Sequence, residues 1–437
     1  MLRIWSFVLT VVLGMAGLVL TPGTAEAIPA FARKYKLGCN TCHIVYPQLN
    51  RFGRDFRDNG FRMPDEIEPL LKRKNAPAAP APPAPVASHA PPDASAPADD
   101  DEATFWSFIP EQIPLSIQAK LHDVINPKGD VKTDFQLEEL QLQAGGTMTP
   151  RISYYLHHHL VEEGQPGDLY TGWVRFNNLA HSSWNVTVGQ FELPLSFSPE
   201  IERVSSFDYL VFGQQLGTNA FDLNTPQLGV QVFGQTDGGT KFWAGVVNGD
   251  GLAINDATGT NDSNSFKDVY ARVTQEFGEH FVGGFAYYGR ARGSTDEAGT
   301  FSDNFIRVGA DAFVNLRKVI VFGTAVYARD DNPLGTGERR SFTGGFAEGD
   351  VFLNYHTILT TRFDVVHQKE PAFLTAVEEG AATADIAADE IPFRVNTIAF
   401  TPGIQCLVRP NVKLGFEYQV RQERGEDRGI AQLHISF

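Results

Sequence analysis

The chain has 437 residues, of which 52 are acidic and 36 are basic, giving a net charge of −16 at pH 7. This charge argues against nucleic acid as a partner, because phosphates would repel the protein. Three cysteines are too few for a disulfide framework. The length suits two or three ordinary domains, or one large β-barrel with an appendage.

The first 27 residues have the pattern of a secretory signal peptide. Arg3 precedes an almost wholly apolar run over residues 7–20, and Thr21-Pro22-Gly23 ends that run. Ala25-Glu26-Ala27 fits the small-residue pattern of a cleavage site, so we expect the mature chain to begin at Ile28. The alternative is a retained membrane anchor, for which the apolar run is short.

Residues 28–75 are basic and aromatic, and we expect them to form a small, mostly helical or irregular module. Cys39-Asn40-Thr41-Cys42-His43 is a CxxCH motif. Two thiols at this spacing can add to the vinyl groups of haem, and the adjacent imidazole can bind its iron. We therefore predict one covalent haem c, attached at Cys39 and Cys42 and ligated by His43.

Two other functions of a CxxC pair fit the sequence less well. A zinc site of this kind needs a second cysteine pair, and the chain has only one further cysteine, Cys406. A thioredoxin-like redox pair needs a βαβ pattern around it, which the sequence lacks. For the second axial position of the iron, Met63 is the candidate inside the module. His89 and an open position are the alternatives.

The composition of the module also suits a haem. Six aromatic side chains would supply an apolar cage for the ring: Phe31, Tyr35, Tyr46, Phe52, Phe56 and Phe61. Five basic side chains would neutralise haem propionates, face an acidic barrel or simply be solvated: Arg33, Lys34, Arg51, Arg54 and Arg57.

Residues 76–103 are a low-complexity segment rich in alanine and proline, which ends in the acidic run Asp99 to Glu102. Proline at this density favours extended polyproline II, with a reach of about 3.1 Å per residue. We expect a semi-rigid linker that separates two folding units.

From residue 104 to residue 437 the pattern is that of β-strands. Residues 115–122, 268–274 and 412–421 alternate apolar and polar side chains, and period two indicates strands. A soluble sandwich and an outer-membrane barrel would both give this pattern. Export, aromatic pairs near strand ends such as Tyr154-Tyr155, and the final amphipathic strand ending in Phe437 favour the barrel.

The predicted fold class is therefore mainly β, with an antiparallel outer-membrane barrel behind the small haem module. Since each strand with its connection takes about twenty residues, we expect about sixteen strands. A barrel of that width is expected to enclose an aqueous lumen rather than a core of side chains.

His157 and His159 alternate on one of the predicted strands and would share one of its faces. Two imidazoles placed in this way could bind a metal ion together in the lumen. The alternative is that they belong to a polar strand end at the membrane interface.

Three segments of the module resemble the N-terminus of the fused cytochrome-porin family. They are Ile28-Pro29-Ala30-Phe31-Ala32-Arg33, the CNTCH motif, and the run Pro47-Gln48-Leu49-Asn50-Arg51-Phe52-Gly53-Arg54 with Asn59-Gly60-Phe61 after it. Members of that family are single-haem outer-membrane proteins, and they include ferrous iron oxidases. The barrel part also contains a short run similar to one in O/P-type porins, Gly189-Gln190-Phe191-Glu192-Leu193-Pro194.

The resemblance implies a location in the outer membrane of a Gram-negative bacterium, in contact with its lipid. It also implies transfer of single electrons from extracellular Fe(II) to a periplasmic c-type cytochrome, which would make the protein a ferrous iron oxidase. Two alternatives remain: outward electron transfer by the same route, and a solute porin whose haem module gates or senses.

Overall fold

The computed structural model describes residues 30–72, 115–127, 129, 131–197, 203–249, 262–368, 396–409, 411–422 and 427–436. The expected signal peptide at 1–27, the expected linker at 76–103, His89 and Phe437 lie outside the described residues. Among the described residues, no helix combines the length and the apolar character needed to span a membrane.

The N-terminal segment, residues 30–72, folds into short helices around a two-stranded hairpin, and we call it the module. Its elements are α2 (Ala30–Tyr35), η1 (Cys39–Thr41), β1 (His43–Val45), β2 (Gln48–Leu49), α3 (Arg51–Asp58) and α4 (Pro64–Lys72). Asn50 caps α3, since its side chain accepts a hydrogen bond from the Gly53 amide. Proline at the first position of α4 suits a helix start, because the missing amide would have had no partner there.

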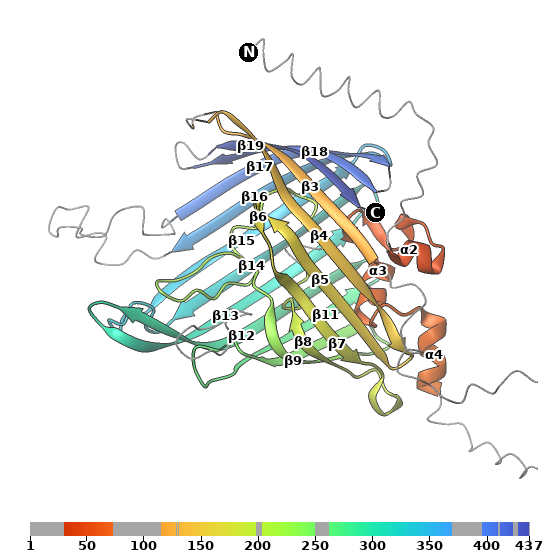
Figure 1. Ribbon diagram of the computed structural model, residues 1–437, viewed down its shortest axis with the longest axis horizontal. Coiled ribbons are helices and arrows are strands. Elements are labelled where there is room, and N and C mark those ends of the chain that lie inside the picture. The colour runs from red at the N-terminus through yellow and green to blue at the C-terminus, as the bar shows by residue number, and fades with distance from the viewer. Residues whose placement is uncertain are drawn as a thin grey trace, which may run out of the picture.

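The rest of the described chain forms a closed antiparallel barrel (Figure 1). Its strands are β3 (Leu115–Ile125), β4 (Thr133–Thr149), β5 (Ile152–Glu162), β7 (Leu169–Phe176), β8 (Asn185–Phe191), β9 (Gln227–Gln235), β10 (Thr240–Val247), β11 (Asp268–Phe277), β12 (His280–Thr295), β13 (Gly299–Asn315), β14 (Val319–Asp330), β15 (Arg340–Phe352), β16 (Thr357–Gln368), β17 (Asn396–Arg409), β18 (Val412–Arg421) and β19 (Arg428–Ser436). β6 (Gln165–Pro166) is a two-residue side pairing on β5, and η3 (Leu179–His181) joins β7 to β8. In the part of the chain that the structure describes, sixteen strands thus close the barrel through the β19–β3 pair, which confirms the predicted antiparallel barrel of about sixteen strands.

The two faces of the barrel wall are opposite in character to those of a soluble sandwich. On β11, Asp268, Tyr270 and Arg272 are buried, whereas Val269 and Val273 are 43% and 48% exposed. The polar side chains therefore point into the barrel and the valines point outward. An apolar outer band and a polar inner surface are typical of a barrel surrounded by lipid. This arrangement rules out the sandwich alternative.

The interior differs from the expected aqueous lumen. The described part of the connection between β8 and β9, residues 192–197 and 203–226, folds into the barrel, and we call it the lumen loop. Its apolar side chains are buried against aromatic side chains on the inner face of the wall. Tyr209, for example, stacks on Phe346 of β15 with ring centroids 3.9 Å apart. The prediction of a purely aqueous interior was wrong, because this loop and the inward-facing aromatics form a core of side chains.

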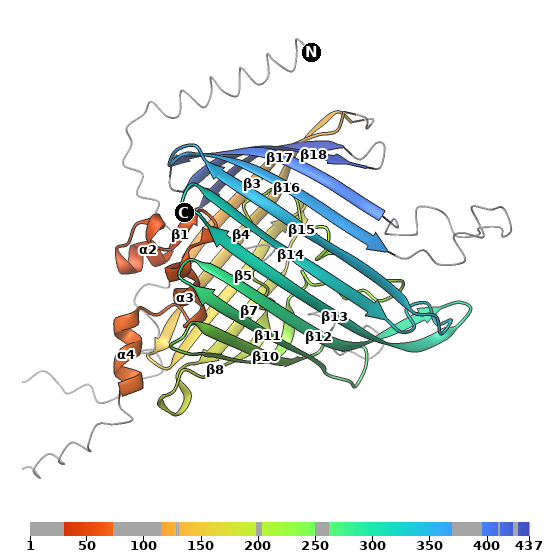
Figure 2. The ribbon, with the colours of Figure 1, turned by 180° about the vertical axis from the view of Figure 1, so that it is seen from behind.

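The module occupies the mouth of the barrel at the end where strands are joined by short turns (Figures 1 and 2). Arg62 donates through Nη1 to the carbonyl oxygen of Pro150, in the β4–β5 turn, at 3.0 Å. The amide of Arg51 donates to the Glu279 carboxylate, in the β11–β12 turn, at 3.2 Å. The module is therefore a plug held by the barrel wall.

Candidate functional site

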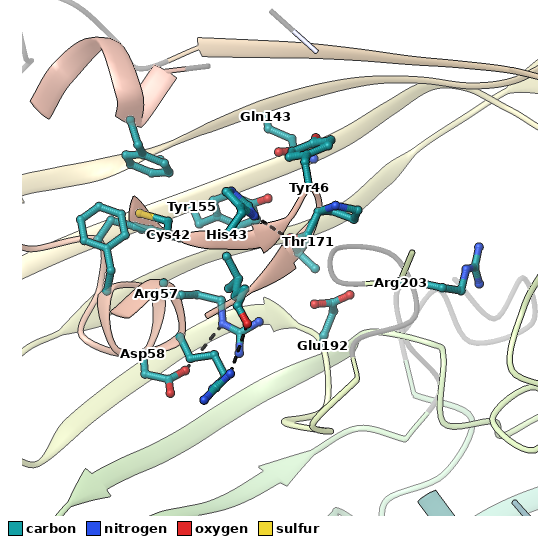
Figure 3. Close-up of a pocket in the computed structure, with 18 of the residues that line it drawn as sticks. Cys42, His43, Tyr46, Arg57, Asp58, Gln143, Tyr155, Thr171, Glu192 and Arg203 are labelled. Carbon is teal, nitrogen blue, oxygen red and sulfur yellow. Dashed lines mark hydrogen bonds and ion pairs between the residues drawn. The ribbon is translucent and has the colours of Figure 1, made fainter. Parts of the chain in front are cut away.

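A cavity of about 310 Å³ lies inside the barrel mouth, between the module, the barrel wall and the lumen loop. Its volume is at the lower end of the range for ligand and cofactor pockets, about 300–1,000 Å³. Cys39, Cys42 and His43 all line it. Figure 3 shows Cys42 and His43 beside Tyr155, which comes from β5 of the wall. The structure thus brings the three predicted haem-binding residues together on one cavity.

The CxxCH segment is fixed to α3 by Asn50. The Asn50 amide donates to the Cys42 carbonyl at 2.9 Å, and its side-chain Nδ2 donates to the Thr41 carbonyl at 2.9 Å. The same side chain caps α3 through the Gly53 amide. One asparagine therefore sets the position of the motif relative to the helix behind it.

Gly53 allows that helix to approach the motif closely. A methyl group at this position would lie 2.1 Å from the Cys42 carbonyl oxygen and 2.9 Å from Cδ2 of Leu49. Since the nearer contact is with backbone, no side-chain rotation could relieve it. The glycine is needed for space, because only a hydrogen fits between α3 and Cys42.

The two thiols are free and half-buried, and no disulfide joins them. Burial raises the pKa of Cys39 and of Cys42, so both are protonated thiols at neutral pH. η1 keeps them in one turn, with the Cys42 amide donating to the Cys39 carbonyl at 3.2 Å. Two thiols on one short turn can serve the two vinyl groups of a single porphyrin.

His43 is held in the tautomer that binds metal. Its Nδ1 lies 2.9 Å from the Pro47 carbonyl oxygen, which can only accept, so Nδ1 carries the proton and Nε2 keeps its lone pair. Burial lowers the pKa of the His43 imidazole to about 4, although the carbonyls of Pro47 and Gln48 partly oppose this. The ring is therefore neutral at physiological pH, as an iron ligand must be. Thiols, imidazole and cavity together fit haem c.

Aromatic side chains form the apolar part of the cavity wall. Phe31 stacks on Phe61 with ring centroids 4.7 Å apart, and Phe61 stacks on Trp173 of β7 at 5.9 Å. Of the six predicted cage residues, five line the cavity, whereas Phe52 packs behind Phe56. Tyr155 and Trp173 were not predicted, and both come from the barrel wall. The period-two pattern contained a signal for Tyr155, since it shares a strand face with His157.

Charged side chains line the remaining wall. The cations among them are Arg54, Arg57, Lys120, Arg175, Arg203, Lys241, Arg272 and Lys413. Cations of this kind are the usual partners of carboxylates such as haem propionates. Of the predicted basic residues, Arg51 and Arg54 instead meet Glu276 of β11, at 3.5 Å and 3.7 Å.

The other predicted site residues lie away from the CxxCH turn. Met63 packs against the aromatic cluster of Phe56, Phe61 and Tyr155 and is not among the residues that line the cavity. His157 and His159 point into the barrel from β5 and are 1% and 0% exposed. Their ring centroids lie 4.7 Å apart, so the predicted pairing of the two imidazoles on one strand face is present.

Known structures resemble the barrel. The anion-selective porin from Comamonas acidovorans matches with a TM-score of 0.54 at 10% identity, over 75% of this chain and 99% of that chain. The outer membrane channel DcaP of Acinetobacter baumannii matches with a TM-score of 0.51 at 13% identity, over 75% of this chain and 97% of that chain. OprB of Pseudomonas putida matches with a TM-score of 0.51 at 13% identity, over 75% of this chain and 94% of that chain. The chain therefore has a porin-like β-barrel. Neither a protein-family model nor a curated protein matches the sequence.

Proposed function

We propose that the protein is a single-haem conduit that carries electrons across the outer membrane. The observation that carries the proposal is the CxxCH turn, whose two thiols and neutral imidazole border one cavity inside the mouth of the barrel. Cys39 and Cys42 would hold haem c and His43 would ligate its iron through Nε2. Bound there, haem c would supply a one-electron redox centre between extracellular Fe(II) and a periplasmic c-type cytochrome.

The barrel supports an outer-membrane location with the module on the periplasmic side. The outward valines of β11 give the wall an apolar surface for lipid. Barrels of this kind have short periplasmic turns and longer extracellular loops. The module contacts the short turns at Pro150 and Glu279, which would place Cys39 and Cys42 near the periplasm.

Interior packing distinguishes a conduit from an open pore. The lumen loop buries Leu216 and Phe212 at 0% and 1% exposure, and the module closes the cavity at the turn end. Electrons can tunnel through packed side chains between a haem and a nearby donor or acceptor, whereas hydrated solutes need continuous water. The packing therefore favours electron transfer over solute passage.

The first experiment compares haem content in three single variants of the full chain. Cys39→Ala and Cys42→Ala should each lower the covalent haem content, because each removes one of the two attachment bonds, and the fall is seen as less porphyrin mass retained after acid extraction. Cys406→Ala is the matched control, since this thiol on β17 is not among the residues that line the cavity, and its haem content should not change. Intact wild-type protein without porphyrin mass would overturn the proposal.

A second experiment addresses the donor. Fe(II) added to the oxidised wild-type protein should produce the absorption bands of reduced haem. An unchanged oxidised spectrum would exclude Fe(II) as the donor, and a redox titration would then decide whether the potential suits outward electron transfer. Reduction by Fe(II), with electrons passed on to a periplasmic cytochrome, would make the protein a ferrous iron oxidase.

The porin-like fold supports a second candidate, a solute porin whose module gates or senses. The similarity to an anion-selective porin and to an outer membrane channel is the observation in its favour. Liposome swelling separates the two functions. Rapid swelling with small solutes, retained in Cys39→Ala, would favour the porin, and absence of swelling would favour the conduit.

A further inference from the structure

The inner face of β5 carries a polar cluster next to the cavity that the haem proposal does not use. His157 lies between Gln143 of β4 and Thr171 of β7 in the register of the sheet. Gln143 and Thr171 line the cavity and are labelled in Figure 3. Tyr155, also in the cavity wall, has its ring centroid 6.4 Å from that of His157. The cluster is therefore one row of side chains beyond the cavity.

His157 is buried without satisfying its polar atoms. It is 1% exposed, and neither of its ring nitrogens has a hydrogen-bond partner among the described residues. The hydroxyl of Thr171 beside it likewise lacks one. Buried polar groups are almost always satisfied, so unpartnered nitrogens in a native protein indicate a water or an ion that completes the site. In a neutral imidazole one of the two nitrogens carries a lone pair, and the lone pair of His157 can bind such a water or ion.

The neighbouring histidine, His159, lies on the same strand face and beside an acidic side chain. Nδ1 of His159 lies 3.1 Å from the Glu162 carboxylate. An acidic side chain this close attracts the imidazole and would stabilise a cation bound to it. The two imidazoles, with ring centroids 4.7 Å apart, can each place a nitrogen at a metal–nitrogen distance of about 2.0–2.1 Å from one ion.

The ring of Tyr170 holds the pair in place. It stacks on His159 with ring centroids 5.0 Å apart and an angle of 13° between the rings, and its centroid lies 5.0 Å from that of His157.

Within the described ranges, no group of three His, Cys, Asp or Glu side chains is placed to hold a metal. A site with two protein ligands leaves the other coordination positions to water.

We infer that His157 and His159 bind a divalent first-row transition-metal ion inside the barrel. Imidazole nitrogen is a suitable ligand for Fe(II), Zn(II), Ni(II) and Cu(II). Binding itself needs no haem. A role of the bound Fe(II) as electron donor rests on the proposed function, because the site adjoins the cavity that would hold the haem.

The test uses the full haem-loaded chain and Zn²⁺, a redox-inert probe, measured by titration calorimetry. His157→Phe combined with His159→Phe keeps aromatic rings beside Tyr170 but removes the nitrogens. We expect Zn²⁺ affinity at this site to fall at least about tenfold, the scale of losses in metal-site variants. His158→Phe is the matched control, since His158 is half-buried and lies between His157 and His159 on the opposite strand face. The Zn²⁺ binding isotherm of this variant should match that of the wild type.

Equal Zn²⁺ binding by the double variant and the wild type would overturn the inference, as would the absence of binding by the wild type. Heat-modifiable gel mobility and haem absorption show whether the double variant has folded. Cys39→Ala separates this inference from the proposed function, because Zn²⁺ binding should persist without haem. The donor role is tested by the rate of haem reduction in the haem-loaded wild type and double variant. If Fe(II) reduces the haem of the double variant more slowly than that of the wild type, while dithionite reduces both equally fast, the donor role is supported. Equal rates with Fe(II) overturn it.

Discussion

Nζ of Lys241, on the inner face of β10, lies 2.9 Å from Oδ2 of Asp58, near the end of α3. The same ammonium group lies 3.1 Å from Glu276 of β11 and 2.7 Å from Asp55. Lys241 and Glu276 are only 3% and 6% exposed. One buried lysine of the wall therefore neutralises carboxylates from both the module and the barrel, and it joins the two parts.

Replacing Lys241 by alanine should release the module from the barrel wall. Removing one partner of a buried ion pair costs about 3–5 kcal/mol, and without Lys241 the two buried carboxylates keep only longer contacts, such as Asp58 to Arg57 at 3.6 Å and Glu276 to Arg51 at 3.5 Å. Hydrogen exchange of the α3 amides should then accelerate roughly 100-fold or more. Lys267→Ala is the control, since Lys267 pairs with Asp262 at a 48% exposed position, where a pair contributes about 1 kcal/mol or less. Equal exchange in both variants would contradict this role.

Acid should weaken the same contact. Burial by itself would raise the pKa of Asp58, but the charges of Lys241 and Arg57 outweigh it and hold the pKa below the ordinary value of 3.8. A carboxyl group with a lowered folded-state pKa contributes stability that is complete above its unfolded pKa and is lost as the pH falls through the folded value. Protection of the α3 amides, corrected for intrinsic exchange, should stay constant from neutral pH down to the ordinary aspartate range.

Below the ordinary pKa range of aspartate, the protection of the α3 amides should decline. Asp58→Asn should remove this decline, because the amide does not titrate, while Lys241 stays paired with Glu276. A decline centred near neutral pH in the wild type would instead point to a histidine as the titrating group.

The sequence predicted what depends on neighbouring residues. Period-two alternation gave the strands, and their number follows from length, so the sixteen-stranded barrel could be predicted. The CxxCH motif is also local, and Cys39, Cys42 and His43 meet on one cavity because a single turn carries them.

Contacts between distant segments could not be predicted in this way. Asp58 and Lys241 are 183 positions apart, and nothing in either segment indicates the other. Alternation shows which side chains point inward but not what fills the interior, so the lumen loop was missed. Phe285 and Phe346 point inward, against the polar pattern expected of a lumen, because the loop covers them with apolar side chains.

Gly53→Ala should impair haem attachment. The added methyl group would press on the Cys42 carbonyl at 2.1 Å, so the CxxCH turn would have to move away from α3. Overpacking of this kind costs about 1–3 kcal/mol. We expect several-fold less covalent haem per polypeptide, measured by pyridine haemochrome absorption. Gly349→Ala on β15 is the control, since a Cβ there meets no atom within 4 Å, and its haem content should equal that of the wild type.

Tyr209→Ala should open the barrel to ions. Tyr209 is 1% exposed and stacks on Phe346 with an angle of 10° between the rings. Removing a buried aromatic ring costs about 3–5 kcal/mol, and this ring holds the lumen loop to β15. Single-channel conductance in planar bilayers should therefore rise above that of the wild type.

Tyr355→Ala makes the same chemical change at a residue that is 97% exposed in the β15–β16 turn, and it should leave the conductance unchanged. If both variants conduct like the wild type, the lumen loop stays in place without this stack. If the wild type already conducts like an open porin, the loop does not block the passage of ions, and the packing argument against solute transport fails. Only a rise confined to Tyr209→Ala agrees with a barrel whose interior is closed by its own side chains.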